Sequence, residues 1–283
     1  MTAFTLEQAQ GMLLGLAVGD AVGTTVEFKA RRTFPPVTDM VGGGPFHLKP
    51  GEWTDDTSMA LCLAESLLAN RGWDPADCMN RFVDWRDGGV NSVTGACFDI
   101  GNTTCDALDR YLRDGNPYTG STDAFSSGNG GIMRQAPAVV FCPTSEADAV
   151  ELSVLQSRTT HASEDCETYA RHLARLLHHG DIWKAEATLP RDCSVDRVKS
   201  SGYVRHTYEA AVWAVENTED FRDAILKAVN LGDDADTVGA VAGQIAGRIY
   251  GENGIPEEWL DRLAWRDRIR DLARQLYALG LQT

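Results

Sequence analysis

Glycine recurs at every fourth position in one small and apolar stretch of the chain. Gly239, Gly243 and Gly247 lie within residues 238–247, where alanine, valine and isoleucine supply most of the other positions. A spacing of four places side chains on one face of an α-helix, so this stretch predicts a helix with a smooth glycine stripe. Glycine lowers helix propensity by up to about 1 kcal/mol relative to alanine, and close packing should be the compensation. We therefore expect a buried helix that another backbone approaches closely.

An acidic cluster comes directly before this predicted helix. Asp233, Asp234 and Asp236 fall within four positions, and the hydroxyl of Thr237 follows them. Carboxylates at a helix start often accept hydrogen bonds from its free N–H groups, so one interpretation is a capping turn. Carboxylate and hydroxyl oxygens are also ligands that suit Mg²⁺, Mn²⁺ or Ca²⁺ better than zinc. This stretch alone leaves both interpretations open.

A second cluster of the same kind lies upstream. Thr54, Asp55 and Asp56 open another predicted helix, again with a hydroxyl beside adjacent carboxylates. Together the two clusters offer enough oxygen ligands for two divalent cations, with water completing each octahedron. We therefore hypothesise that these turns, far apart in the sequence, meet in the fold. The ligand set of this hypothesis is Thr54, Asp55, Asp56, Asp234, Asp236 and Thr237.

Helical spacing of apolar residues dominates the rest of the chain, whereas the alternation typical of strands is almost absent. The first helix begins after Thr5, which forms a capping-box pattern with Gln8, and ends near residues 19–23. Residues 31–52 are rich in proline and glycine and predict a long loop, which is often functional. Further helices are predicted at 53–68, 75–86, 104–112, 134–140, 146–156, 164–178, 206–216, 219–230, 237–250 and 257–279. We expect an all-α fold with loops gathered at one end.

Composition limits the classes of protein that remain. The 283 residues, 43% of them hydrophobic, suffice for a large core, and no linker divides the chain, so we predict one domain over residues 1–283. A net charge of −15 without a Lys/Arg-rich stretch argues against nucleic-acid binding. The seven cysteines form no C-x-x-C pair, which favours a reducing compartment. No signal peptide or membrane span is evident, so we expect a cytoplasmic protein, acting as a monomer.

Two acidic residues outside the clusters are further candidates. Glu27 follows a glycine-rich turn and precedes the long loop, so its carboxylate could cover a site, bind a metal or hold a water. The alternative is a solvated loop glutamate, as most such residues are. Asp99 lies between apolar residues and should be partly buried. It either caps the helix that begins near Thr103 or presents its carboxylate to a ligand hydroxyl.

A glycine-rich turn at residues 127–134 precedes another predicted helix. Backbone N–H groups and the helix dipole at such a turn can hold a phosphate. The turn matches neither a P-loop nor a dinucleotide-binding fingerprint, and a turn without a ligand is the alternative. His161 follows two threonines, and a single histidine is more often structural than catalytic.

Taken together, these motifs resemble the ADP-ribosylglycohydrolase family, whose members remove ADP-ribose from modified targets. The matching segments are residues 19–27, 54–57, 128–134, 160–161 and 232–237, which follow the family's order and span nearly the whole chain. Residues 97–102 and 231–237 most resemble the bacterial dinitrogenase-reductase-activating glycohydrolases. The resemblance implies an all-α fold with a binuclear Mg²⁺ or Mn²⁺ centre. Asp233 is a departure, because many relatives have glycine there, and we assign it no ligand role.

The resemblance also implies roles for single residues. The six oxygen ligands named above would hold the metals, Glu27 would gate the site or bind metal, and Asp99 would contact the ribose or act in catalysis. Asp56 joins Glu27 and Asp99 as a catalytic candidate. The turn at 128–131 would hold the diphosphate. The substrate-binding candidates are Gly101, Gly128, Asn129, Gly130, Gly131, Ile132, Met133 and His161.

The function implied by the resemblance is metal-dependent hydrolysis of the N-glycosidic bond of ADP-ribosylated protein, with arginine as the preferred modified residue and ADP-ribose as product. Serine, O-acetyl and nucleic-acid linkages are alternatives. A two-metal phosphoesterase is another, although no basic residues cluster near the acidic motifs in the sequence. A non-catalytic ADP-ribose-binding module is the third, and the intact acidic motifs argue against it.

Overall fold

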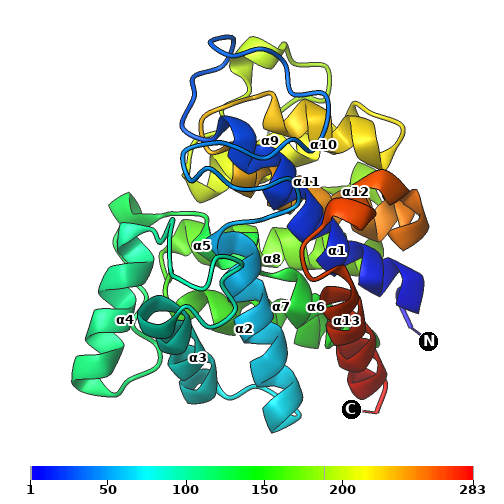
Figure 1. Ribbon diagram of the computed structural model, residues 1–283. Helices are drawn as coiled ribbons and strands as arrows, with labels where there is room; N and C mark the ends of the chain where they lie inside the picture. Colours follow the sequence, from blue (N-terminus) through cyan, green and yellow to red (C-terminus); the bar gives the residue numbers. More distant parts are fainter. Residues whose placement is uncertain (1, 188, 283) are drawn as a thin grey trace.

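The computed structural model describes residues 2–187 and 189–282, and within them the chain is helical, with no β-strand. This confirms the predicted all-α class. The α-helices are α1 (Leu6–Gly23), α2 (Asp55–Asn70), α3 (Pro75–Gly88), α4 (Asn102–Asp114), α5 (Gly130–Met133), α6 (Ala136–Val140), α7 (Glu146–Arg158), α8 (Glu164–His179), α9 (Val204–Glu216), α10 (Phe221–Val229), α11 (Ala235–Tyr250), α12 (Glu257–Arg262) and α13 (Arg266–Gly280). In Figure 1, α1 crosses between α2–α8 below and α9–α10 above.

The helix pair α1 and α11 lies at the centre of the molecule. The two helices run antiparallel, because Gly15 meets Gly243 while Gly19 meets Gly239 one turn further along. A Cβ atom added to Gly243 would lie 1.9 Å from the carbonyl oxygen of Gly15, so no side chain fits between the backbones. The close approach predicted from the glycine stripe is confirmed. Its partner is a second glycine stripe of the same period in α1, which the sequence analysis did not single out.

The α1–α11 pair determines where the functional segments lie. At one end of the pair, Gly23 packs against the backbone of Ala235. The chain leaves α1 there and reaches Glu27 after a short 3₁₀ turn, Thr24–Val26, while Asp234 stands at the start of α11. The two segments are then joined directly, because the N–H of Phe28 donates to the carbonyl oxygen of Asp233 at 2.7 Å. The glycine packing therefore brings the first and last acidic segments together.

Asp20 fixes the start of α2 against α1. Its fully buried carboxylate accepts hydrogen bonds from the backbone N–H of Thr54 at 2.9 Å and of Thr57 at 3.1 Å, and from the Thr57 hydroxyl at 2.6 Å. Burial raises the pKa of Asp20 to about 6, and these hydrogen bonds oppose part of that rise. An aspartate from another helix thus takes the capping role, which frees the acidic residues of α2 for other contacts.

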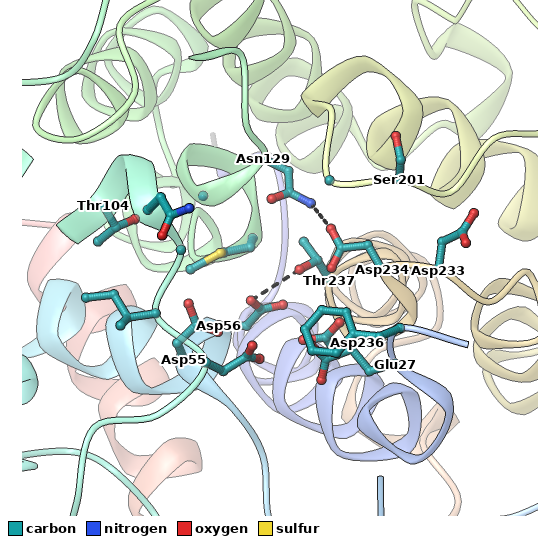
Figure 2. A pocket seen from close by; sticks show the side chains of 18 of the residues that line it. Glu27, Asp55, Asp56, Thr104, Asn129, Ser201, Asp233, Asp234, Asp236 and Thr237 are labelled. Atoms are coloured by element: carbon teal, nitrogen blue, oxygen red, sulfur yellow. Dashed lines mark hydrogen bonds between the residues drawn. The ribbon is translucent and has the colours of Figure 1, made fainter. Parts of the chain in front are cut away.

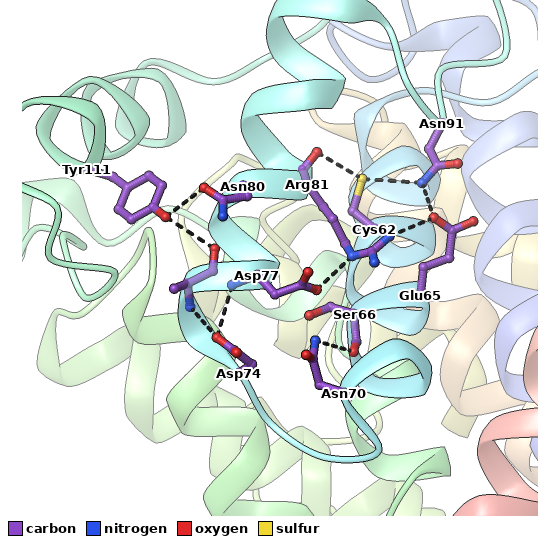
Figure 3. A network of polar contacts seen from close by, with 11 residues as sticks. Cys62, Glu65, Ser66, Asn70, Asp74, Asp77, Asn80, Arg81, Asn91 and Tyr111 are labelled. Atoms are coloured by element: carbon purple, nitrogen blue, oxygen red, sulfur yellow. Dashed lines mark hydrogen bonds and ion pairs between the residues drawn. The ribbon is translucent and has the colours of Figure 1, made fainter.

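Polar contacts hold α2, α3 and α4 together on the other side of the site (Figure 3). The guanidinium of Arg81 in α3 contacts Asp77 at 2.8 Å and Glu65 of α2 at 3.4 Å. The hydroxyl of Tyr111 in α4 donates to Asn80 of α3 at 2.7 Å. Because α4 is anchored in this way, the segment that leads into it, residues 95–101, has a fixed position beside the start of α2.

The predicted helix over 257–279 is wrong in one respect, since the structure divides it into α12 and α13. The break occurs where Ala264 donates its N–H to the carbonyl oxygen of Gly51 at 3.0 Å and accepts a bond from the Trp53 indole at 3.3 Å. Trp265 then adopts a left-handed backbone, φ 58°, and packs edge-on against Trp53. Contacts with the long loop therefore outweigh the helical pattern. The helix predicted over 134–140 corresponds to α6, and the short helix α5 before it lies in the segment predicted as a glycine-rich turn.

Candidate functional site

The two acidic clusters meet in the folded chain, although 180 residues separate Thr54 from Asp234. The hydroxyl of Thr54 lies 3.4 Å from Asp236, and that of Thr237 lies 3.4 Å from Asp56. Figure 2 shows the carboxylates of Asp56 and Asp236 turned toward the same space. One oxygen each from Asp55, Asp56 and Asp236 fall within 4.8 Å of one another. A second such group comprises Glu27, Asp99 and Asp236. Asp236 is common to both groups.

The acidic side chains at these helix starts are not capping groups. Thr54 and Asp234 occupy the N-cap positions of α2 and α11, but neither makes a side-chain capping bond. The Asp234 carboxylate instead accepts a bond from the Asn129 amide at 2.5 Å. Asp99 does not cap α4 either, because the N-cap residue is Gly101. The capping alternatives left open by the sequence therefore do not apply, and these side chains face one another instead.

Crowding of buried carboxyl groups dominates the electrostatics of the site. Burial, and then the neighbouring carboxylates, raise the pKa of Asp55, Asp56 and Asp236 well above the ordinary aspartate value. Burial together with Asp236 raises the pKa of Glu27 to about 10, and burial together with Asp55 raises that of Asp99 to about 11. Without a compensating positive charge, these groups favour their protonated forms.

Several of these oxygens also lack partners. Oε2 of Glu27, Oδ2 of Asp56 and Oδ1 of Asp236 are buried without a hydrogen-bond partner among the described residues. Unpaired buried polar atoms are costly, and an ion that binds between them would satisfy them. The donors are all oxygen, which suits a hard divalent cation. The residues present therefore fit a metal site.

The raised pKa values predict how the stability of the metal-free protein depends on pH. The pKa of these carboxyl groups is higher in the folded than in the unfolded protein, so their protonation favours folding. This contribution to the free energy of unfolding is fully present below about pH 4 and is lost as pH rises toward the folded pKa, about 10 for Glu27. With a chelator present, we expect the Tm to fall between about pH 6 and pH 9. Differential scanning calorimetry would measure this.

The matched controls for this pH dependence are two isosteric variants. Asp236→Asn removes a buried titratable carboxyl group from the cluster and should flatten the fall in Tm, whereas Asp233→Asn removes an exposed one and should not. Equal slopes for the wild type and Asp236→Asn would show that the net charge of the whole protein, not this cluster, sets the dependence.

The acidic groups line a cavity of about 970 Å³, which is large enough for a nucleotide-sized ligand. Its wall contains these predicted site residues: Glu27, Asp55, Asp56, Asp99, Gly101, Asn129, Gly130, Met133, His161, Asp234, Asp236 and Thr237. Four predicted residues do not line it, namely Thr54, Gly128, Gly131 and Ile132. Thr54 still reaches the site by its contact with Asp236, whereas Ile132 is fully buried in the core.

The glycine-rich turn is required by packing as well as by any ligand. The N–H groups of Gly128 and Asn129 already donate to carbonyl oxygens within the protein, those of Ser126 and Gly202. A Cβ atom at Gly130 would lie 2.4 Å from the ring of His161, so only glycine fits at that position. Of the four turn residues, Asn129 and Gly130 reach the cavity. The role of this turn in phosphate binding stays a prediction.

His161 is a neutral imidazole with a defined tautomer. It is buried, and desolvation, with some help from the Arg134 charge, lowers its pKa to about 3. The Arg134 guanidinium, which can only donate, bonds the Thr160 hydroxyl oxygen at 2.7 Å. That hydroxyl lies 2.8 Å from Nδ1 of His161, and we assign its hydrogen to this contact because Arg134 already donates to the hydroxyl oxygen. The ring hydrogen is therefore on Nε2, which makes His161 a neutral donor.

Sequence reasoning missed several residues of the cavity wall. Phe28, Phe46, Thr104, Ser201 and Gly202 line it and were not among the candidates. The segment with Ser201 and Gly202 is tied in by backbone bonds, since Asp234 donates to Ser200 and Asn129 to Gly202. The one available signal was a run of small polar residues directly before a helix, the same pattern that marks the glycine-rich turn.

Basic side chains do gather beside the acidic site, contrary to the argument made from the sequence. They line a neighbouring cavity of about 360 Å³ that shares Ser201 and Asp233 with the acidic one. The basic residues of this cavity are Arg31, Arg32, Lys199 and His206. The guanidinium of Arg31 is already used by backbone carbonyls, among them that of Val198 at 2.6 Å. The argument against a phosphoesterase that was based on a lack of nearby basic residues therefore does not hold.

The family model for ADP-ribosylglycohydrolases matches residues 1–283. The chain belongs to the ADP-ribosylglycohydrolase family. It is therefore a glycosidase of that family, and the resemblance recognised from the motifs is confirmed. Among solved structures, a chain described as an ADP-ribosylglycohydrolase-related protein complex superposes with a TM-score of 0.82 at 39% identity, covering 97% of this chain and 98% of the other.

Three named relatives locate the chain within the ADP-ribosylglycohydrolase family. It is 46% identical to ADP-ribosylarginine hydrolase Tri1 of Pseudomonas putida, covering 96% of this chain and 78% of the relative. The same enzyme of Serratia proteamaculans is 45% identical, covering 98% and 80%. ADP-ribosyl-[dinitrogen reductase] glycohydrolase of Rhodospirillum rubrum is 35% identical, covering 96% and 95%. Sequence identity is thus higher to the two arginine hydrolases than to the dinitrogen reductase enzyme, whose subgroup residues 97–102 and 231–237 most resemble.

Among the helices of the described residues, none is long and apolar enough to cross a membrane.

Proposed function

We propose that this protein hydrolyses the N-glycosidic bond between ADP-ribose and an arginine side chain of a modified protein, which releases ADP-ribose and restores the arginine. The observation that carries the proposal is the acidic cavity in which Glu27, Asp99 and Asp236 face one another within 4.8 Å. The names of the two arginine hydrolases, which are at least 45% identical over nearly the whole chain, support the choice of linkage.

We also propose that the site holds two divalent cations, Mg²⁺ or Mn²⁺. The support is that the oxygens form two groups which share Asp236, and that unpartnered buried oxygens occur in both groups. The proposed ligands are Thr54, Asp55, Asp56, Asp234, Asp236 and Thr237. When bound, such cations polarise the hydroxyl groups of a sugar and lower the pKa of a bound water.

The acidic residues would act on the distal ribose. Cleavage of a glycosidic bond proceeds through a transition state with positive charge at C1, and nearby carboxylates stabilise it. Asp99 is held in a left-handed backbone, φ 62°, directly before Ile100 and Gly101 in the cavity wall. This placement suits a contact with a ribose hydroxyl. Glu27, which belongs to the same group of three acidic residues as Asp99 and Asp236, would hold the attacking water or close the site.

The uncharged part of the cavity would hold the diphosphate. Gly130, Met133 and His161 lie together in its wall and bring no negative charge to it. His161 offers a neutral N–H donor there, and Asn129 and Gly130 of the turn at 128–131 reach the same wall. The phosphates would in this way be kept away from the carboxylates that act on the ribose.

The test is product analysis with a panel of substrates. The protein would be incubated with arginine-, serine- and nucleic-acid-linked ADP-ribose, with Mg²⁺, with Mn²⁺ and with a chelator. We expect free ADP-ribose from the arginine conjugate, fastest with metal present. Release of AMP would instead indicate a phosphoesterase, and tight binding of ADP-ribose without turnover would indicate a binding module. Faster cleavage of another conjugate would overturn the arginine assignment.

The remaining expectations stay proposals of the same kind: a single domain over residues 1–283 that acts as a cytoplasmic monomer on ADP-ribosylated proteins rather than on nucleic acid. All seven cysteines are free, which supports a reducing compartment. Size-exclusion chromatography with light scattering would measure the oligomeric state.

A further inference from the structure

Three phenylalanine rings gather at the acidic cavity. Phe46 lies 5.0 Å from Phe98 and 6.5 Å from Phe28, centroid to centroid, with the rings tilted or edge-on. Phe28 and Phe46 line the cavity itself. The rings come from three separate segments, and two of them are adjacent in sequence to acidic residues of the site: Phe28 follows Glu27, and Phe98 precedes Asp99. Aromatic faces and carboxylates are thus placed side by side.

The conformation of Phe28 is costly for the protein. The residue is 68% exposed, so it contributes little to the core. Its backbone is left-handed, φ 60°, a region that costs an ordinary residue about 1 kcal/mol or more. The fold enforces this conformation, because Phe28 donates to Asp233 at 2.7 Å and Asp233 donates to Lys29 at 2.8 Å. A strained, exposed aromatic ring in a cavity wall points to contact with a ligand.

The chemistry of the subsite selects the ligand group. A guanidinium is a flat cation whose faces stack on aromatic rings and whose N–H groups pair with carboxylates. Resting on the function proposed above, we propose that Phe28 and Phe46, with Phe98 supporting Phe46, form the subsite for the guanidinium and methylene stem of the target arginine. Glu27 and Asp99 lie next to this subsite, so the bond to be cleaved is placed at the acidic centre.

The experiment compares ring variants in the metal-loaded protein. Phe28→Ala is expected to raise the KM for an ADP-ribosyl-arginine protein about tenfold, as expected for a lost cation–π contact, while the Kd for free ADP-ribose stays within about twofold. Phe28→Trp should retain the wild-type KM because it restores a ring. The matched control is Leu112→Ala, which removes another exposed apolar side chain, 56% exposed, near the far end of α4.

Two other outcomes overturn the arginine subsite alone, and a third overturns the proposed function. If Phe28→Ala leaves KM unchanged while the wild type cleaves the arginine conjugate, the subsite is wrong and the proposed function stands. If the variant weakens free ADP-ribose equally, the ring stacks on the nucleotide instead, and the subsite is again wrong. If the wild type does not cleave the arginine conjugate at all, the proposed function fails, and the arginine subsite fails with it.

Discussion

Replacing Asp236 with asparagine is expected to lower kcat for ADP-ribosyl-arginine hydrolysis by a factor of about a thousand, equivalent to about 4 kcal/mol of transition-state stabilisation. Asp236 is the residue common to both groups of converging oxygens, and it is 2% exposed. Asparagine keeps the shape but removes the charge that both metal positions would share. Steady-state kinetics at saturating Mg²⁺ would measure the loss, and calorimetric titration with Mn²⁺ would show whether metal affinity falls with it.

The matched control for Asp236→Asn is Asp233→Asn, the same change three residues earlier. Asp233 is an exposed residue of the cavity wall, has no assigned ligand role and adopts a left-handed backbone that asparagine tolerates well. Its activity should stay within about threefold of the wild type, because an exposed charge is well screened. Without metal, at neutral pH, Asp236→Asn should be more stable than the wild type, since the buried asparagine is neutral without having to take up a proton on folding. Full activity of Asp236→Asn would overturn the proposed metal site.

The second large effect is on stability. Gly243→Ala places a methyl group 1.9 Å from the Gly15 carbonyl oxygen, so α1 and α11 must move apart. Overpacking a core typically costs 1–3 kcal/mol, and a backbone cannot yield as a side chain does, so we expect a loss of about 3 kcal/mol or more. The gain in helix propensity, about 1 kcal/mol, offsets only part of this loss. Urea unfolding would measure the change in the free energy of unfolding.

Gly88→Ala is the control for the glycine substitution. Gly88 is the last residue of α3, and an added Cβ atom would meet its nearest neighbour, Val90, at an ordinary 3.9 Å. Alanine there should leave the protein equally stable or stabilise it by up to about 1 kcal/mol. Gly243→Ala should also weaken metal binding, because the same helix pair positions Glu27 and Asp236. Equal unfolding energies for the two variants would contradict the close contact of α1 with α11.

Much of the candidate site could be predicted because its signals are local. A hydroxyl beside adjacent carboxylates is visible in the sequence at Thr54 and again near Thr237, and each falls at the start of a helix that its own apolar spacing predicts. That the two turns meet was a hypothesis, and the contact of Thr54 with Asp236 agrees with it. What local pattern could not predict was that Asp20 would cap α2.

The misses share a different cause. The break between α12 and α13 depends on hydrogen bonds of Ala264 with Gly51 and Trp53, more than 200 residues earlier in the chain. The exposed ring of Phe28 depends on a backbone bond to Asp233. No local sequence pattern marks Gly51 and Trp53 as partners of the 257–279 segment, or Asp233 as the partner of Phe28. The apolar spacing of 257–279 and the loop composition around Phe28 therefore could not predict these contacts.

The amino-acid sequence by itself determined most of the helices, the glycine face of α11 and the oxygen chemistry of the acidic turns, because these depend on residues within about one helical turn of each other. Only the tertiary structure decided that the glycine faces of α1 and α11 meet in antiparallel register, which places Glu27 beside Asp236. The physical reason is that a glycine stripe permits close backbone contact but does not specify the helix or the register that fills it, and that a buried carboxylate acquires its pKa and its partners from groups that arrive from elsewhere in the chain.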